Sequence, residues 1–175
     1  MKDRHLSEHS TIYNYTLLKK IPYSTYYKTL YAGILALGVI SLVTAYGLAA
    51  FITIVIAYVL VQVLHALLLR QLLAIAHSNQ RNVWKFKLNF PSVGYLPEGF
   101  IPSSLYKRLH LHLSIVGTAV IGLAYVWVQP LYFYSLLMMH AWVLLPRLFH
   151  LWQFHKLKKS GLIKCNPLDT SFYIT

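Results

Sequence analysis

The sequence predicts an all-α membrane protein in which four transmembrane helices form two hairpins. Three observations indicate this class: the hydrophobic content is 57% with a mean hydropathy of +0.52, two long segments lack acidic and basic residues, and the basic residues lie outside those segments. Soluble domains usually contain about 45–50% apolar residues, so this chain of 175 residues is unusually apolar.

The first uncharged segment, 29–69, contains no Asp, Glu, Lys or Arg. As a single helix at about 1.5 Å per residue it would be roughly 60 Å long, about twice the ~30 Å hydrocarbon core of a bilayer. We therefore expect it to fold back, and Tyr46-Gly47 is the natural turn because glycine relaxes the backbone there. This predicts transmembrane helices at 30–45 and 48–76.

A second segment, 109–146, repeats this design, because it again lacks Asp, Glu, Lys and Arg. The dipeptide Gln129-Pro130 interrupts it near the middle, and proline is disfavoured inside a helix. The pattern therefore predicts a second hairpin with helices at 105–128 and 131–156.

Short β elements are expected between and after the hairpins. Segment 84–90 alternates apolar side chains with Lys and Asn, and this period of two predicts a strand on the membrane surface. The tail alternates again at 172–174, so we expect it to pair with this loop strand. Ser103 or Ser104 is expected to cap the third helix. The tyrosine-rich segment 12–31 is typical of an aromatic belt at the membrane interface.

The distribution of positive charge predicts the topology. The formal net charge is +12, and all sixteen Lys and Arg lie in the N-terminal segment, in the middle segment with its helix ends, or near the C-terminus. The positive-inside rule places these three parts, and so both termini, in the cytoplasm. No nucleic-acid recognition motif is visible, and we expect a multi-pass protein of a bacterial plasma membrane. The expected organisation is a cytoplasmic or interfacial segment 1–28, a first hairpin 29–76, a cytoplasmic loop 77–108, a second hairpin 109–156 and a cytoplasmic tail 157–175.

Polar side chains within the apolar helices are the candidate functional residues, because they are costly at membrane depth. They are Gln62, His65, Arg70, His110, His112, His140, Arg147 and His150. We single out His65, His140, Arg147 and Arg70 as candidates for binding a ligand within the membrane. Arg147 shares a helix face with His140, seven residues earlier. Snorkelling to the headgroups is nevertheless the favoured interpretation of its side chain.

The predicted spans lack the acids that membrane hydrolases need. The four carboxylates of the chain are Asp3, Glu8, Glu98 and Asp169, and all of them lie in flanking segments. Metalloproteases and aspartyl proteases require an acid beside the reacting water. We therefore expect no catalytic residue, no resident metal and no enzyme activity. One alternative stays open, in which His65 and His140 ligate a haem or a metal ion between two helices.

One segment of the predicted second helix, His65-Ala-Leu-Leu-Leu69, resembles the HExxH motif of a bacterial zincin peptidase family of integral membrane proteins related to site-2 proteases. The layout is similar over most of the chain, with a hairpin before the motif, a cytoplasmic loop, a second hairpin and a short tail. Ala66 stands at the position of the general-base glutamate, Leu69 at that of the second histidine, and Arg147 where the family supplies an acidic ligand. The resemblance therefore implies a zincin-like pseudoprotease without zinc.

Together these features predict a non-catalytic, pseudoprotease-like scaffold, or an accessory or immunity-type subunit, that binds a peptide, a lipid or a membrane partner. Lys156, Lys158 and Lys159 are expected to contact anionic lipid headgroups. Two alternatives remain: a bis-histidine haem or metal-binding membrane protein, and a small transporter subunit.

Overall fold

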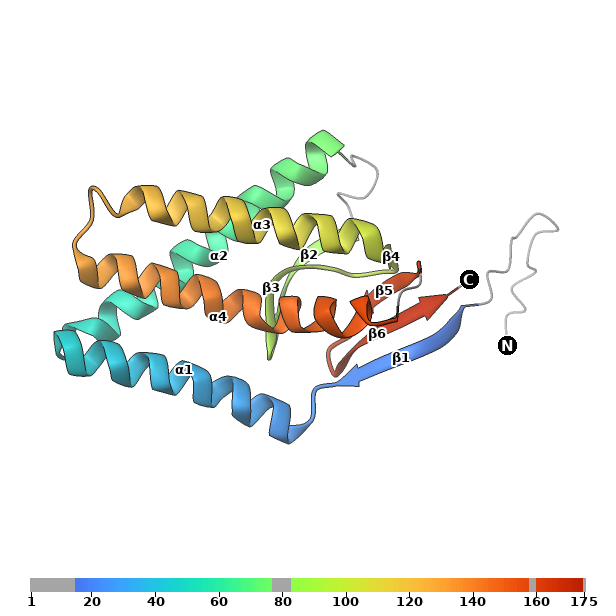
Figure 1. Cartoon of the computed structure of the whole chain (residues 1–175), viewed down its shortest axis with the longest axis horizontal. Coiled ribbons are helices and arrows are strands. Elements are labelled where there is room, and N and C mark those ends of the chain that lie inside the picture. The colour runs from blue at the N-terminus through green and yellow to red at the C-terminus, as the bar shows by residue number, and fades with distance from the viewer. Residues whose placement is uncertain (1–14, 77–82, 158–159, 175) are drawn as a thin grey trace, which may run out of the picture.

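The computed structural model describes residues 15–76, 83–157 and 160–174, and Figure 1 shows how its elements are arranged. The helices are α1 Thr25–Tyr46, α2 Ala49–Ala76, α3 Ser103–Ala124 and α4 Pro130–His155. The strands are β1 Thr16–Pro22, β2 Trp84–Asn89, β3 Ser92–Pro97, β4 Ile101–Pro102, β5 Leu162–Cys165 and β6 Asp169–Ile174. The expected succession of four helices is confirmed for the described chain.

Both expected helix turns are present. After α1, Gly47 has a φ of +76° and its N–H donates to the carbonyl of Val43 at 2.8 Å, a conformation that favours glycine. The helix α4 begins at Pro130, which suits a first turn because proline has no N–H to leave unpaired. The helix α1 begins earlier than expected, since the side chain of Ser24 accepts the N–H of Tyr27 and caps it.

Three of the described helices are long and apolar enough to cross a membrane: α1, Ala49–Ile75 of α2, and α4. The helix α3 is not among them. Its first half contains Lys107, Arg108, His110 and His112, which lower its hydropathy. The prediction of four spans is thus supported for three helices.

A four-stranded antiparallel sheet in the order β1-β6-β5-β4 lies at the end of the bundle where both ends of the described chain meet (Figure 1). The strand β1 lies within the segment 12–31, and its pairing with β6 was not expected. The aromatic belt expected for 12–31 stays a prediction. The strand expected at 84–90 is confirmed as β2, but β2 pairs with β3 in a hairpin. The tail instead reaches the loop through the pairing of β5 with β4. The expected pairing of the tail with 84–90 was therefore wrong.

The cap expected from Ser103 or Ser104 was also wrong. The helix α3 already begins at Ser103, and Pro102 occupies the capping position without a side-chain hydrogen bond. The Ser103 N–H instead donates to the Gly161 carbonyl at 2.8 Å, and its hydroxyl accepts the Gly161 N–H at 3.4 Å. The start of α3 is therefore attached to the chain just before β5.

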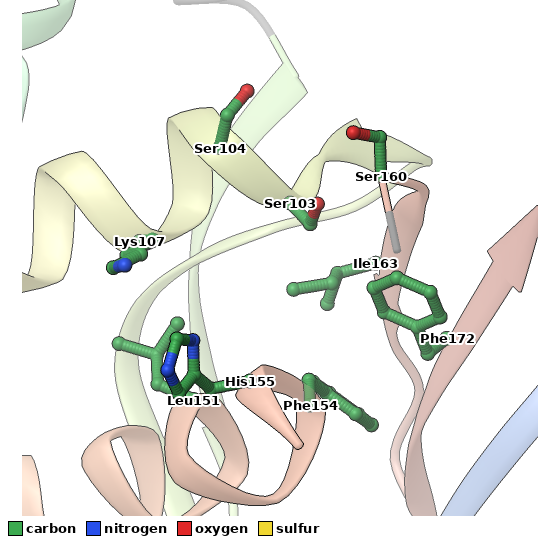
Figure 2. Close-up of a pocket in the computed structure, with 9 residues that line it drawn as sticks. All are labelled: Ser103, Ser104, Lys107, Leu151, Phe154, His155, Ser160, Ile163 and Phe172. Carbon is green, nitrogen blue, oxygen red and sulfur yellow. The ribbon is translucent and has the colours of Figure 1, made fainter. Parts of the chain in front are cut away.

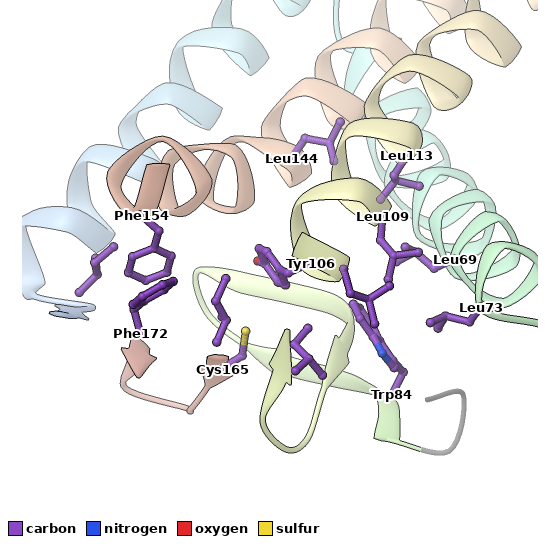
Figure 3. Packing of buried hydrophobic residues seen from close by; sticks show 14 residues of the cluster. Leu69, Leu73, Trp84, Tyr106, Leu109, Leu113, Leu144, Phe154, Cys165 and Phe172 are labelled. Atoms are coloured by element: carbon purple, nitrogen blue, oxygen red, sulfur yellow. The ribbon is translucent and has the colours of Figure 1, made fainter. Parts of the chain in front are cut away.

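Two hydrophobic clusters hold these elements together. One lies where α2, α3 and α4 meet the strands, and Figure 3 shows Leu69, Tyr106 and Leu109 packed within it. The other joins α1, α2 and α4, where the hydroxyl of Tyr31 donates to the carbonyl of Trp142 and the Trp142 indole donates back to the Tyr31 carbonyl, both at 3.1 Å. Many large apolar side chains of α1 and α2 remain exposed, which is typical of a surface that contacts a membrane or a partner.

Candidate functional site

The polar residues at the centre of the helices lie against one another rather than against the outside. His65 of α2 and His140 of α4 are 0% and 2% exposed, and Nε2 of His65 lies 2.8 Å from Nδ1 of His140. At this distance one ring donates an N–H to the other, and the rings meet edge to face at 74°. The structure therefore places His65 and His140, two of the four candidate residues that the sequence indicated, in direct contact.

The helix α3 completes the surroundings of His140. The hydroxyl of Thr118 lies 3.2 Å from Nε2 of His140, so both ring nitrogens have a partner. A Cβ at Gly117 would collide with the His140 ring, and only glycine allows the ring to pass this close to α3. Nδ1 of His65 has no hydrogen-bond partner in the described part of the chain.

Arg147 is fully buried, at 0% exposure, and points inward onto the β2–β3 hairpin. Its Nη2 donates to the carbonyl of Val93 at 2.8 Å, whereas Nε and Nη1 have no partner among the described residues. The expectation that Arg147 snorkels to the headgroups was therefore wrong. The physical reason is that β3 packs against α2 and α4 and presents a backbone carbonyl to this guanidinium.

Gly94 allows the β2–β3 hairpin to pack closely against Gln62 of α2 and Arg147 of α4. Its φ is +119°, and a Cβ there would lie 2.5 Å from Nη2 of Arg147 and 2.7 Å from Oε1 of Gln62. A side chain at this position would therefore displace both polar groups. Gln62 is 6% exposed, and neither its amide nitrogen nor its amide oxygen has a partner within the described chain. We call Gln62, His65, His140 and Arg147 the polar cluster.

The charge of the polar cluster is not balanced by the described residues. The ion pairs formed within 15–76, 83–157 and 160–174 are Lys20 with Asp169 at 3.4 Å and Lys85 with Glu98 at 2.7 Å, and neither involves Arg147. An unpaired ion inside a protein loses its hydration without compensation. The polar cluster therefore offers hydrogen-bond donors and a positive charge to an acceptor that the described chain does not provide.

Two histidines that the sequence placed among the polar candidates are buried as well. His110 of α3 is 0% exposed and its Nδ1 donates to the Tyr106 carbonyl at 2.9 Å. His150 of α4 is 1% exposed, and its ring stacks on Tyr23 with centroids 5.7 Å apart. Nε2 of each ring lacks a partner among the described residues.

The remaining predicted site residues lie apart from the polar cluster. Arg70 is exposed on α2. Lys156 is exposed, and its Nζ lies 3.6 Å from the centroid of the Trp152 ring. Lys158 and Lys159 lie outside the described residues. Sequence reasoning missed Thr118. It indicated Gly117 as a close-packing position and Gly94 as a turn residue, but not their contacts with His140, Gln62 and Arg147, because these depend on how distant elements pack.

The geometry also bears on metal binding. No group of three or more His, Cys, Asp or Glu that could hold a metal ion occurs in the part of the chain that the structure describes. A metal bound between two opposed imidazoles, at about 2.0–2.1 Å from each nitrogen, needs the nitrogens about 4 Å apart. The 2.8 Å contact between His65 and His140 is a direct hydrogen bond, so a haem would require the two rings to separate.

Two hollows open near these elements. The α2–β2 groove has a volume of about 390 Å³ and is lined by Tyr58, Val59, Gln62, Val63, Ala66, Phe86 and Leu88. A smaller hollow of about 270 Å³ lies between the start of α3 and the end of α4 (Figure 2). Its polar side chains, including Lys107 and His155, are all partly or fully exposed. Of these two hollows in the described chain, the groove is the one that includes a member of the polar cluster, namely Gln62.

Comparison of the chain with family models, with curated proteins and with solved structures found no match. The resemblance of the His65–Leu69 segment to the HExxH motif therefore stays a prediction.

Proposed function

We propose that this protein is a multi-pass membrane protein that binds a ligand without catalysis, as a pseudoprotease does, and that the ligand presents an anionic group to the polar cluster. The observation that carries this proposal is the burial of Arg147 with two unpartnered nitrogens and no carboxylate beside it in the described chain. An anion would supply both the missing charge and the missing hydrogen-bond acceptors.

The surroundings of His65 support a role in binding rather than hydrolysis. Ala66 and Leu69 follow it on α2 and provide neither an acid nor a metal ligand. His65 is instead hydrogen-bonded to His140. The neighbouring cation of Arg147 would repel a metal ion and attract a carboxylate or a phosphate. A zincin-like layout whose reactive positions have been replaced is what a pseudoprotease requires.

We further propose four spans, including α3, with both termini in the cytoplasm of a bacterial plasma membrane. The loop 77–108 enters and leaves the bundle from the cytoplasm, and its β2–β3 hairpin reaches Gln62 and Arg147 between the helices. Two observations support this. The positive charges gather in three segments, and the sheet β1-β6-β5-β4 joins strands from those same three segments at one end of the bundle. Anionic headgroups on that side would attract Lys156 and the adjacent lysines.

The proposed function is tested by ligand-induced stabilisation of the purified protein in phosphatidylcholine nanodiscs. The probes share one alkyl chain and differ in the head: a phosphate, a carboxylate, a trimethylammonium and a maltoside. At a hundred times its Kd, a ligand stabilises the folded state by about 2.7 kcal/mol. For a chain of this size that is roughly 5–10 °C in Tm.

We expect at least one anionic probe to raise Tm in the wild type and to leave Tm unchanged in Arg147→Met. The matched control Lys156→Met removes an exposed cation immediately after the same helix and should retain the response. Equal stabilisation by the cationic and anionic probes would contradict the proposal, as would stoichiometric zinc together with peptidase activity.

A further inference from the structure

The α2–β2 groove opens towards the surroundings of the helices. Four of its lining side chains are large, apolar and half or more exposed: Val59 (54%), Val63 (51%), Phe86 (51%) and Leu88 (76%). They come from one face of α2 and from β2 of the hairpin. The groove volume of about 390 Å³ lies within the range of small-molecule sites. A hydrocarbon chain is therefore the ligand that best fits the apolar side chains lining the groove.

One polar residue interrupts these walls. Gln62 lines the groove, yet it is 6% exposed and its amide nitrogen and oxygen both lack a partner in the described chain. Its Oε1 and Nη2 of Arg147 both lie against Gly94, so the buried cation lies next to the amide. Both amide atoms are buried, so the unpaired amide and the positive field lie immediately behind the apolar walls. The amide reaches a bound group when the Gln62 side chain turns towards the groove.

We propose that the α2–β2 groove binds a long-chain fatty acid, with the hydrocarbon chain on Val59, Val63 and Phe86 and the carboxyl group on the amide of Gln62. The Gln62 Nε2 donates to a carboxyl oxygen, and the adjacent Arg147 favours negative charge on that oxygen. This inference rests on the proposed function, because it identifies the ligand that the polar cluster receives.

The depth of Gln62 favours a fatty acid over a phospholipid. Gln62 lies midway along Ala49–Ile75, the apolar part of α2, which places it about 20 Å from either end at about 1.5 Å per residue. A phosphodiester headgroup stays charged at neutral pH and is not expected at that depth. A carboxyl group reaches it in the neutral form, and Gln62 pairs with the neutral or the ionised form.

The test uses palmitate that carries a photoreactive diazirine on its chain, with the full-length protein in phosphatidylcholine nanodiscs. We expect crosslinks to the stretch 58–66 and to Phe86 or Leu88. Palmitate should compete at least about tenfold better than methyl palmitate, because the ester has neither the charge nor the O–H donor. Gln62→Leu should reduce the crosslink yield to a similar extent.

A pair of matched substitutions separates the groove from the rest of α2. Ala66→Phe fills the groove, whereas Ala74→Phe places the same side chain at an exposed position on the same helix. We expect the crosslink to disappear in the first variant and to persist in the second. Equal crosslinking of both variants, or equal competition by the acid and the ester, would overturn the inference.

Two further outcomes separate this inference from the proposed function. If an apolar peptide with a free C-terminal carboxylate displaces the probe more strongly than palmitate does, the fatty acid is the wrong ligand. If palmitate fails while another anionic probe still stabilises the wild type through Arg147, this inference is rejected and the proposed function stands. If no anion stabilises the protein, both are rejected.

Discussion

Nε2 of His65 and Nδ1 of His140 lie 2.8 Å apart, and this hydrogen bond joins α2 to α4 at the buried centre of the helices. Both side chains are buried and have no access to solvent or lipid. Removal of one ring therefore leaves the other with an unsatisfied polar group. Hydrogen bonds between membrane helices contribute about 0.6 kcal/mol on average and about 1.7 kcal/mol at most.

A double-mutant cycle of His65→Leu and His140→Leu should reveal this coupling. We expect each single variant to unfold more easily, and the double variant to lose less than the sum by about 0.6–1.7 kcal/mol. The free energy of unfolding in mixed micelles measures the effect. Strictly additive losses would show that the two rings do not interact.

Gly117 provides a steric test of the same pair. Gly117→Ala should destabilise the protein by about 1–3 kcal/mol, because a Cβ collides with the His140 ring that donates to or accepts from His65. Gly122→Ala is the matched control, since nothing lies within 4 Å of a Cβ at that position of the same helix. Thermal unfolding measures the difference, and we expect a lower Tm for Gly117→Ala than for Gly122→Ala. Equal Tm values would contradict the packing of His140 against α3.

Arg147 should not stabilise the ligand-free protein relative to an apolar residue. Replacement of a buried ion pair by apolar side chains of similar volume is often neutral or stabilising by about 1–4 kcal/mol, and a buried charge without a partner has even less attraction to lose. The lost hydrogen bond to the Val93 carbonyl offsets about 1 kcal/mol. We therefore expect Arg147→Met to leave the free energy of unfolding unchanged or to raise it by up to about 3 kcal/mol. Lys156→Met should change it by less than about 0.5 kcal/mol. A clear loss of stability in Arg147→Met would mean that an anion already pairs with the cation.

The thiol of Cys165 in β5 gives a prediction for alkaline pH. Burial raises its pKa from 9.0 to about 11, so the folded state holds its proton while the unfolded state loses it. The resulting stability is fully present below pH 9 and is lost as the pH rises towards 11. At pH 8 the thiolate is about a hundredfold scarcer than in the unfolded chain.

Maleimide labelling checks this at pH 8. Cys165 should react only after unfolding, whereas Ser160→Cys, made together with Cys165→Ala, places a thiol at an exposed position nearby and should react within minutes. Rapid labelling of Cys165 in the folded protein would contradict its burial.

The sequence predicted the features that depend on local backbone chemistry. The turns at Gly47 and before Pro130 follow from the conformational limits of those two residues, and both are present. The sequence also indicated His65 and His140, because imidazoles are conspicuous in an apolar helix. Their contact could not be predicted, since it depends on the packing of α2 against α4 over 75 positions of the chain.

Features that depend on long-range pairing were missed or wrong. The strand β1 contains Leu17-Leu18-Lys19-Lys20, which lacks strict alternation, and it forms because β6 pairs with it from the other end of the chain. Arg147 points inward because it donates a hydrogen bond to Val93 of the β2–β3 hairpin. The residues around Arg147 in α4 contain no pattern that predicts this contact.

The topology of α3 separates the proposed four-span arrangement from one with three spans. If α3 crosses, the turns after α1 and after α3 lie outside the cell, whereas the chain before β5 lies inside. In a Cys165→Ala background, Leu48→Cys and Val126→Cys should therefore react with a membrane-impermeant maleimide in intact cells, since both positions are exposed (77% and 75%). Ser160→Cys should react only after lysis. Labelling of Leu48→Cys and Ser160→Cys with protection of Val126→Cys would mean that α3 does not cross. Labelling of Ser160→Cys with protection of both other positions would mean the reverse orientation.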